Sequence, residues 1–110
     1  MDGPGLWDAL HAFIPGFVDD LLGPTFERST VDLVVWHQAN LRLVESLMES
    51  CGFSMDQTVT TVEDYGNTAG ASVPLTLHRA IEVGRLNRGD TVLLVAFGAG
   101  ITVAASLWEW

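Results

Sequence analysis

Residues 31–36 (VDLVVW) and the HQAN tetrapeptide that follows at residues 37–40 decide the fold of this chain. The first segment is rich in β-branched and aromatic residues and has the length of a buried strand. The apolar residues after it recur at the spacing of one helical face: Leu41, Val44, Met48 and Cys51. Gly52 then ends the helix, because glycine adopts a positive φ at little cost. The pattern predicts a strand that leads directly into a helix, with Cys51 in the core.

The same alternation of strand and helix continues toward the C-terminus. Residues 58–62 (TVTTV) are β-branched throughout and predict a second strand, and the apolar spacing over residues 73–81 predicts a helix. Residues 91–97 (TVLLVAF) form a continuous apolar strand, which is typical of burial on both faces. A glycine-rich turn at residues 98–100 leads back through residues 101–108 as a hairpin. We expect an α/β fold with a mostly parallel sheet, an antiparallel C-terminal strand and packed helices.

The N-terminal region has weaker signals. Residues 15–22 show helical spacing that stops at Gly23-Pro24, and Pro15 suits a first helical turn. Residues 6–13 are either an extension of this helix or a separate short helix. We therefore divide the chain into an N-terminal extension or helix start over residues 1–12 and one domain over residues 13–110.

Composition restricts the class of protein. The chain has 110 residues, of which 48% are hydrophobic, and these numbers predict a single folded domain. The formal charge of -9 makes nucleic acid an unfavourable partner. No apolar run approaches the ~20 residues of a membrane span, and the acidic start does not resemble a signal peptide, so we expect a cytoplasmic protein. The one cysteine and three scattered histidines predict neither a disulfide nor a metal site.

Polar and glycine residues follow each of the three predicted strands. His37 follows the first strand, Asn67 follows the second, and a Gly-rich turn follows Phe97 at the end of the third. Because parallel strands end at the same edge of a sheet, these residues can converge. A neutral imidazole and a carboxamide offer N–H donors that stabilise a developing oxyanion. The alternatives are that His37 is structural and that Asn67 and the glycines only shape turns.

Three motifs together carry a resemblance to a known family. HQANLR (residues 37–42), YGNTAGAS (residues 65–72) and RGD (residues 88–90) leading into AFGAG (residues 96–100) resemble, in order and spacing, the C-terminal segment of β-ketoacyl-acyl-carrier-protein synthase III. The resemblance extends from about Phe13 to the C-terminus. It implies an incomplete half of a thiolase-like fold.

The resemblance also implies a reaction, the decarboxylative Claisen condensation of malonyl thioesters in fatty-acid or polyketide biosynthesis. His37 and Asn67 match the family's pair that stabilises the enolate, and Phe97 matches its active-site aromatic residue. The family's oxyanion loop is matched by Gly98, Ala99 and Gly100. No cofactor or metal is implied; the substrates are acyl-CoA and malonyl-acyl carrier protein. The family's assembly implies a homodimer.

Arg42 matches an arginine with which the family docks the acidic acyl carrier protein. Such a role is reasonable for one of only five cations in an acidic chain. The alternative is an exposed helix charge that pairs with Glu45 or Glu49.

The chain also departs from the family. Trp36 stands where Pro is common and Ala99 where Gly is common. The family's nucleophilic cysteine lies in an N-terminal half that these 110 residues do not include, so catalysis requires that half or a partner subunit, and the isolated chain should be inactive. We expect the missing first strand to be central, so that residues 31–36 either pair directly with residues 91–97 or leave room for a borrowed strand. A non-catalytic oligomerisation or carrier-protein-binding module is the alternative function, and acyl-chain specificity and pathway remain open.

Overall fold

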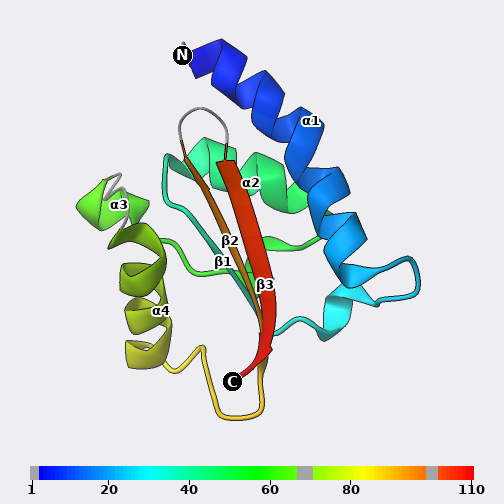
Figure 1. The fold of residues 1–110 in the computed structure, drawn as a ribbon. Coiled ribbons are helices and arrows are strands. Elements are labelled where there is room, and N and C mark those ends of the chain that lie inside the picture. Colours follow the sequence, from blue (N-terminus) through cyan, green and yellow to red (C-terminus); the bar gives the residue numbers. More distant parts are fainter. Residues whose placement is uncertain (1–2, 67–70, 99–101) are drawn as a thin grey trace.

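The protein is a three-stranded sheet with helices on both faces (Figure 1). The computed structural model describes residues 3–66, 71–98 and 102–110. The strands are β1 (Leu33–Trp36), β2 (Thr91–Gly98) and β3 (Thr102–Glu109), in the spatial order β1-β2-β3. β1 and β2 are parallel, and β2 and β3 are antiparallel. The predicted α/β fold with an antiparallel C-terminal strand is therefore confirmed.

The larger core lies between the sheet and helices α1 (Gly3–Leu22) and α2 (Leu41–Ser50). One face of α1 contributes three fully buried side chains: Leu10, Ile14 and Val18. Residues 6–13 belong to this same helix, and Pro15 lies inside it instead of in its first turn. The proline removes one backbone donor from the helix, and the apolar packing of α1 against α2 and β3 offsets that loss.

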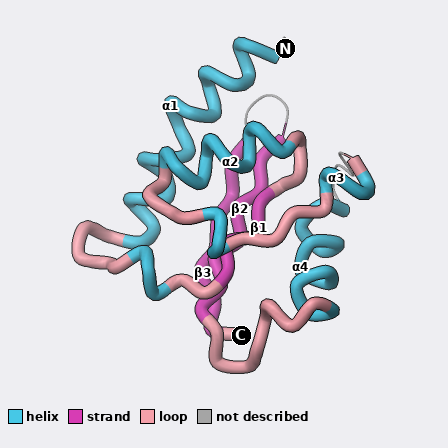
Figure 2. The backbone as a smooth tube through the Cα atoms, turned by 180° about the vertical axis from the view of Figure 1, so that it is seen from behind, coloured by secondary structure: helices cyan, strands magenta, loops and turns pink. Residues whose placement is uncertain are grey.

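A smaller core lies on the opposite face, under α4 (Ser72–Glu82). Leu33 and Val35 of β1 contact Ala80 of α4 in this cluster. The view from behind shows α4 beside the β1 end of the sheet, with α1 and α2 on the other face (Figure 2). Successive side chains of β1 thus point alternately into the larger and the smaller core, as expected for a buried parallel strand.

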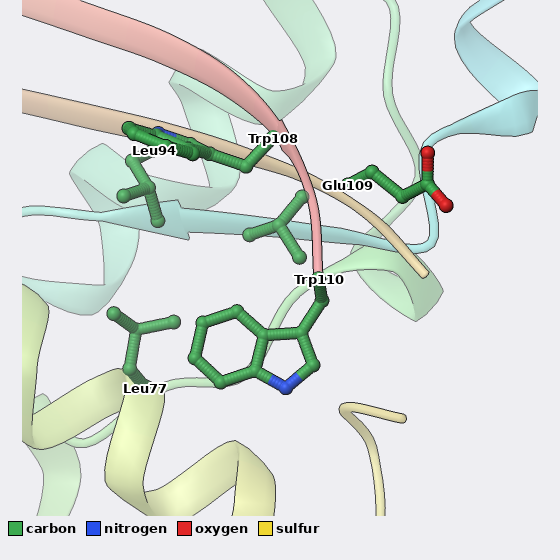
Figure 3. A pocket seen from close by; sticks show the side chains of 6 residues that line it. Leu77, Leu94, Trp108, Glu109 and Trp110 are labelled. Atoms are coloured by element: carbon green, nitrogen blue, oxygen red, sulfur yellow. The ribbon is translucent and has the colours of Figure 1, made fainter. Parts of the chain in front are cut away.

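The sheet face next to α4 carries an apolar groove of about 310 Å³. Leu77 of α4 and Leu94 of β2 line it together with Trp108 and Trp110 (Figure 3). Trp108 is 57% exposed and Trp110 is 47% exposed, which is unusual for large aromatic residues. We call these four residues the tryptophan groove.

The predicted strand over residues 58–62 is wrong. Only Thr58 pairs with the sheet, through a single parallel bridge to Val34, and the chain then enters the four-residue helix α3 (Val62–Tyr65). The hydroxyl of Thr58 donates to the carbonyl oxygen of Val34 at 2.6 Å, and the backbone N–H groups of Thr61 and Val62 donate to the side chain of Gln38. Side chains therefore bond to backbone groups of Val34, Thr61 and Val62 that a longer β-ladder between the two segments would use.

Of the two alternatives for the missing strand, the structure shows the direct pairing of residues 31–36 with residues 91–97 and no room for a borrowed strand between them. β1 pairs directly with β2 in the register Leu33↔Val92 to Trp36↔Val95, so no missing strand lies between them. Two backbone bonds continue the ladder beyond β1, from Asp32 to Thr91 and from His37 to Val95. A first strand supplied from elsewhere would have to add outside this pair.

The structure also has two short 3-10 helices, η1 (Arg28–Thr30) and η2 (Met55–Gln57). The guanidinium of Arg28 donates to the carbonyl oxygen of Cys51 at 2.5 Å and pairs with Asp19, so it joins the ends of α1 and α2. None of the helices in the described ranges has both the length and the apolarity to cross a membrane.

Candidate functional site

His37 lies at the carboxyl end of β1, where the chain leaves the sheet. Its backbone N–H donates to the carbonyl oxygen of Val95 at 3.0 Å, and its carbonyl oxygen accepts from the N–H of Ala39 at 3.2 Å. Its half-buried ring meets the ring of Phe97 edge to face, with centroids 4.9 Å apart and an interplanar angle of 74°. Two parallel strands thus bring together an imidazole and an aromatic ring that are 60 positions apart in the sequence.

Burial sets the protonation state of His37. Loss of water around the ring lowers the pKa of His37 below its usual value, so the imidazole is neutral at neutral pH. Within the described part of the chain, neither ring nitrogen of His37 has a hydrogen-bond partner. The ring can therefore offer one N–H donor to a bound molecule.

The structure places only part of the predicted site. His37, Phe97, Gly98 and Arg42 are described; Asn67, Ala99 and Gly100 lie outside the described residues. Gly98 is the last residue of β2 and is exposed. β1 and β2 run parallel, so His37 and Gly98 end their strands at the same edge of the sheet.

The carboxamide of Gln38 is a site feature that the sequence prediction missed. Gln38 is fully buried directly after His37, and its side chain bonds to Trp36 and to the start of α3. The only signal in the sequence is a large polar residue immediately after a buried strand. A glutamine there looks like the beginning of an exposed loop, and its burial depends on partners about two dozen positions away.

The start of α2 presents Arg42 to solvent. Asn40 caps the helix by accepting a hydrogen bond from the N–H of Leu43 at 2.8 Å. Arg42 is exposed in the first turn, two residues after the cap, and, among residues 3–66, 71–98 and 102–110, makes no ion pair with Glu45, Glu49 or any other acid. Its guanidinium is therefore available to a partner.

Cys51 has the properties of a core residue. It lies at the C-terminal cap of the ten-residue α2, about 15 Å along the helix from the end that follows His37. Burial raises the pKa of the Cys51 thiol to about 12; Asp19 adds to the shift and Arg28 opposes it. The protonated, buried thiol is a poor nucleophile. Nor do the described residues hold any cluster of histidine, cysteine or carboxylate side chains suited to a metal ion.

We expect Cys51 to resist a thiol reagent while the protein is folded. At pH 8 a thiol with a pKa of about 12 is almost entirely protonated, and burial also blocks access to it. The measurement is the release of thionitrobenzoate from a disulfide reagent in buffer and in urea. Reaction should be complete in urea and slow in buffer; equally fast reaction in both, with the fold intact by circular dichroism, would show that the thiol is accessible.

Comparisons with known proteins identify the family of the chain. The family model "3-Oxoacyl-[acyl-carrier-protein (ACP)] synthase III C terminal" matches residues 24–110. The chain is 38% identical over 111 residues to a β-ketoacyl-[acyl-carrier-protein] synthase III of Neisseria meningitidis, covering 100% of this chain and 35% of that protein. It is 41% identical over 91 residues to the enzyme of that name in Coxiella burnetii, covering 82% of this chain and 28% of that protein.

Solved structures of similar proteins share the fold. The 3-oxoacyl-[acyl-carrier-protein] synthase III of Aquifex aeolicus superposes with a TM-score of 0.93 at 32% identity, covering 100% of this chain and 36% of that chain. The corresponding enzyme of Thermus thermophilus superposes with a TM-score of 0.90 at 35% identity, covering 100% of this chain and 35% of that chain.

The extent of these matches has two consequences. A strand inserted between β1 and β2 would separate them by about 10 Å instead of about 5 Å, so the close superposition shows that they are neighbours in the relatives too.

The chain spans about a third of the length of the curated relatives, and it matches their C-terminal part. On this combination of fold, motif order and family match, the chain belongs to the 3-oxoacyl-[acyl-carrier-protein] synthase III C-terminal family.

Proposed function

We propose that this chain is the C-terminal part of a condensing enzyme and supplies the donors that stabilise an enolate during decarboxylative condensation of malonyl thioesters. The observation that carries the proposal is the neutral, half-buried His37, which is held against Phe97 at the shared carboxyl edge of β1 and β2 in a chain of this family. A neutral imidazole with an available nitrogen is a suitable donor for an oxygen that gains charge.

The proposed reaction needs no cofactor. The malonyl thioester loses its free carboxylate as CO2, and the electron pair of the broken C–C bond moves onto the α-carbon and the thioester carbonyl oxygen. Hydrogen bonds from His37 and Asn67 stabilise that enolate oxygen. The α-carbon then attacks the carbonyl carbon of an acyl group held on a cysteine, whose thiolate leaves as the new C–C bond forms.

Other residues have supporting roles in this proposal. Phe97 forms an apolar wall beside His37, and burial of the ring lowers the pKa of His37 and disfavours the imidazolium form. Gly98, Ala99 and Gly100 form the oxyanion loop for the acyl carbonyl. Exposed Arg42 docks the acidic acyl carrier protein, and the absence of an ion pair to it among the described residues supports that role.

The nucleophile has to come from outside these 110 residues, because Cys51 is buried and protonated. We propose that the segment corresponding to the rest of the relatives supplies it, in the same polypeptide or in a partner subunit, within a cytoplasmic homodimer. The tryptophan groove supports the need for a covering segment, since it exposes two large aromatic side chains.

The direct test is a chimera in which residues 1–110 replace the matching C-terminal part of the Neisseria meningitidis relative. We expect the chimera to release CO2 from malonyl-acyl carrier protein and to form the condensation product, because it joins His37 and Asn67 to an intact nucleophile. Radiolabelled CO2 release and mass spectrometry of the product measure the two steps.

Two controls make the result specific. The 110-residue chain alone and the relative's N-terminal part alone should both be inactive. A chimera that folds, dimerises and binds acyl carrier protein but releases no CO2 would contradict the proposal, and would favour a non-catalytic carrier-protein-binding role.

A further inference from the structure

The side chain of Gln38 is held by three backbone groups. Its Nε2 donates to the carbonyl oxygen of Trp36 at 3.0 Å, and its Oε1 accepts from the N–H groups of Thr61 at 3.0 Å and Val62 at 3.3 Å. Two donors face one end of the carboxamide and one acceptor faces the other, so the network permits a single orientation of the amide. Because Gln38 is fully buried, water cannot replace these bonds.

These bonds join the end of β1 to two other elements. Thr61 precedes α3, and its hydroxyl lies 3.2 Å from the hydroxyl of Thr76 in α4. The Thr76 hydroxyl in turn donates to the carbonyl oxygen of Ser72 at 2.7 Å. Gln38, Thr61, Ser72 and Thr76 are all buried. One buried polar chain thus fixes β1, the start of α3 and the start of α4 relative to one another.

The same contacts restrain the peptide that carries His37. Gln38 holds the carbonyl oxygen of Trp36 on one side of His37, while the backbone of His37 bonds to Val95 and Ala39. The imidazole then has little freedom except rotation about its own side-chain bonds, which the contact with Phe97 limits. Loss of the Gln38 carboxamide would remove the side-chain hydrogen bond that holds the carbonyl oxygen of Trp36.

We propose that Gln38 is a positioning residue, which holds the His37 turn against the start of α3 so that the imidazole stays in place beside Phe97. The catalytic consequence rests on the proposed function of His37, whereas the restraint on the ring does not. Gln38 touches no reacting atom in this scheme and acts only through the backbone.

The chain offers a matched control in Gln57. Its Nε2 donates to the carbonyl oxygens of Arg28 and Val31, both at 2.8 Å, and its Oε1 accepts from the N–H of Ser54 at 2.9 Å. Gln57 therefore bridges three backbone groups as Gln38 does, but next to the residues that precede β1. A variant at Gln57 loses the same kinds of bonds at the end of the strand remote from His37.

The first measurement compares Gln38→Met with Gln57→Met in the 110-residue chain by NMR of histidine ring signals. Methionine keeps the length of glutamine and removes the donor and the acceptor. The ring signals of His37, which carry the ring-current shift from Phe97, should move in Gln38→Met and stay in place in Gln57→Met. The ring signals of His11 and His78 serve as internal references in each spectrum.

The second measurement uses the same two variants in the active chimera, at a temperature where both are folded. For Gln38→Met we expect kcat for decarboxylation to fall about 10- to 100-fold, since displacing a catalytic group by about 1 Å costs on that order. KM for malonyl-acyl carrier protein should change by less than about twofold, because the exposed docking residues are untouched. Gln57→Met should leave both constants within about twofold.

The outcomes separate this inference from the proposed function. Equal losses of kcat in both variants, or unchanged His37 ring signals in Gln38→Met, would overturn the positioning role. If instead the ring signals move only in Gln38→Met while a His37→Ala chimera keeps full activity, the restraint is supported and the proposed function of His37 fails.

Discussion

Replacement of His37 by alanine in the chimera is expected to lower the rate of decarboxylation by about 10²- to 10³-fold, the usual cost of removing one preorganised donor to a developing oxyanion. The neutral ring stands at the end of β1, and among the described residues neither nitrogen has a hydrogen-bond partner, so the variant breaks no described hydrogen bond of the ring. CO2 release at saturating malonyl-acyl carrier protein measures the effect on kcat.

Two further variants test the chemical role of the His37 ring. His37→Gln keeps an N–H donor on a side chain of similar reach, so it should lose less activity than His37→Ala. His78→Ala is the matched control, because His78 lies exposed on α4, 3.5 Å from Glu82, and should have no effect. A His37→Ala chimera with the rate of the parent would refute the assignment of His37.

Replacement of Trp36 by alanine is expected to destabilise the chain by about 3–5 kcal/mol, the usual cost of emptying a buried aromatic site. Trp36 is the largest fully buried side chain, and its Nε1 lies 2.9 Å from the sulfur of Met48 in α2. A domain of this size has a free energy of unfolding of about 5–15 kcal/mol, so the variant loses a large share of it. Urea unfolding followed by far-ultraviolet circular dichroism measures the change.

Trp108 provides the control for residue type. It is 57% exposed in the tryptophan groove, and its Nε1 donates to the hydroxyl of Ser106 in the same strand at 2.6 Å. Trp108→Ala should therefore change the free energy of unfolding of the isolated chain by less than about 1 kcal/mol. Equal destabilisation by the two variants would show that Trp36 is not the centre of the core.

Trp36, for which the family resemblance implies proline, is fully buried in the larger core. Its indole lies in the same core cluster as Leu43 and Met48 of α2. The Trp36 side chain therefore fills space between the sheet and α2.

Local signals predicted the elements around the site, and nonlocal contacts account for the failures. The apolar runs that became β1 and β2, and the Gly52 stop after α2, depend on neighbouring residues and were recognisable in the sequence. Residues 58–62 have strong strand propensity, but tertiary hydrogen bonds override it. The order of strands in the sheet is also nonlocal, and no periodicity specifies which strand pairs with which.

The candidate site shows the same division. Strand ends predicted His37 and the turn after Phe97, because parallel strands finish at one edge whatever their order, whereas the role of Phe97 itself was implied by the family resemblance. Gln38 could not be found in this way, since its role depends on Thr61, 23 positions away, and on full burial. Single-sequence patterns identify where reactive groups leave a sheet, but not which buried side chains hold them there.

β3 has consequences for the behaviour of the chain in concentrated solution. Among the residues that the structure describes, β3 pairs with β2 along one side only, so half of its backbone amides and carbonyls point outward at the edge of the sheet. Its eight residues include a single charged side chain, Glu109, where open rims usually carry several charges or a proline. The outer edge of β3 can therefore pair with another extended segment. Where no such segment covers it, the edge strands of two copies of the chain can pair with each other, which leads to fibrous aggregates.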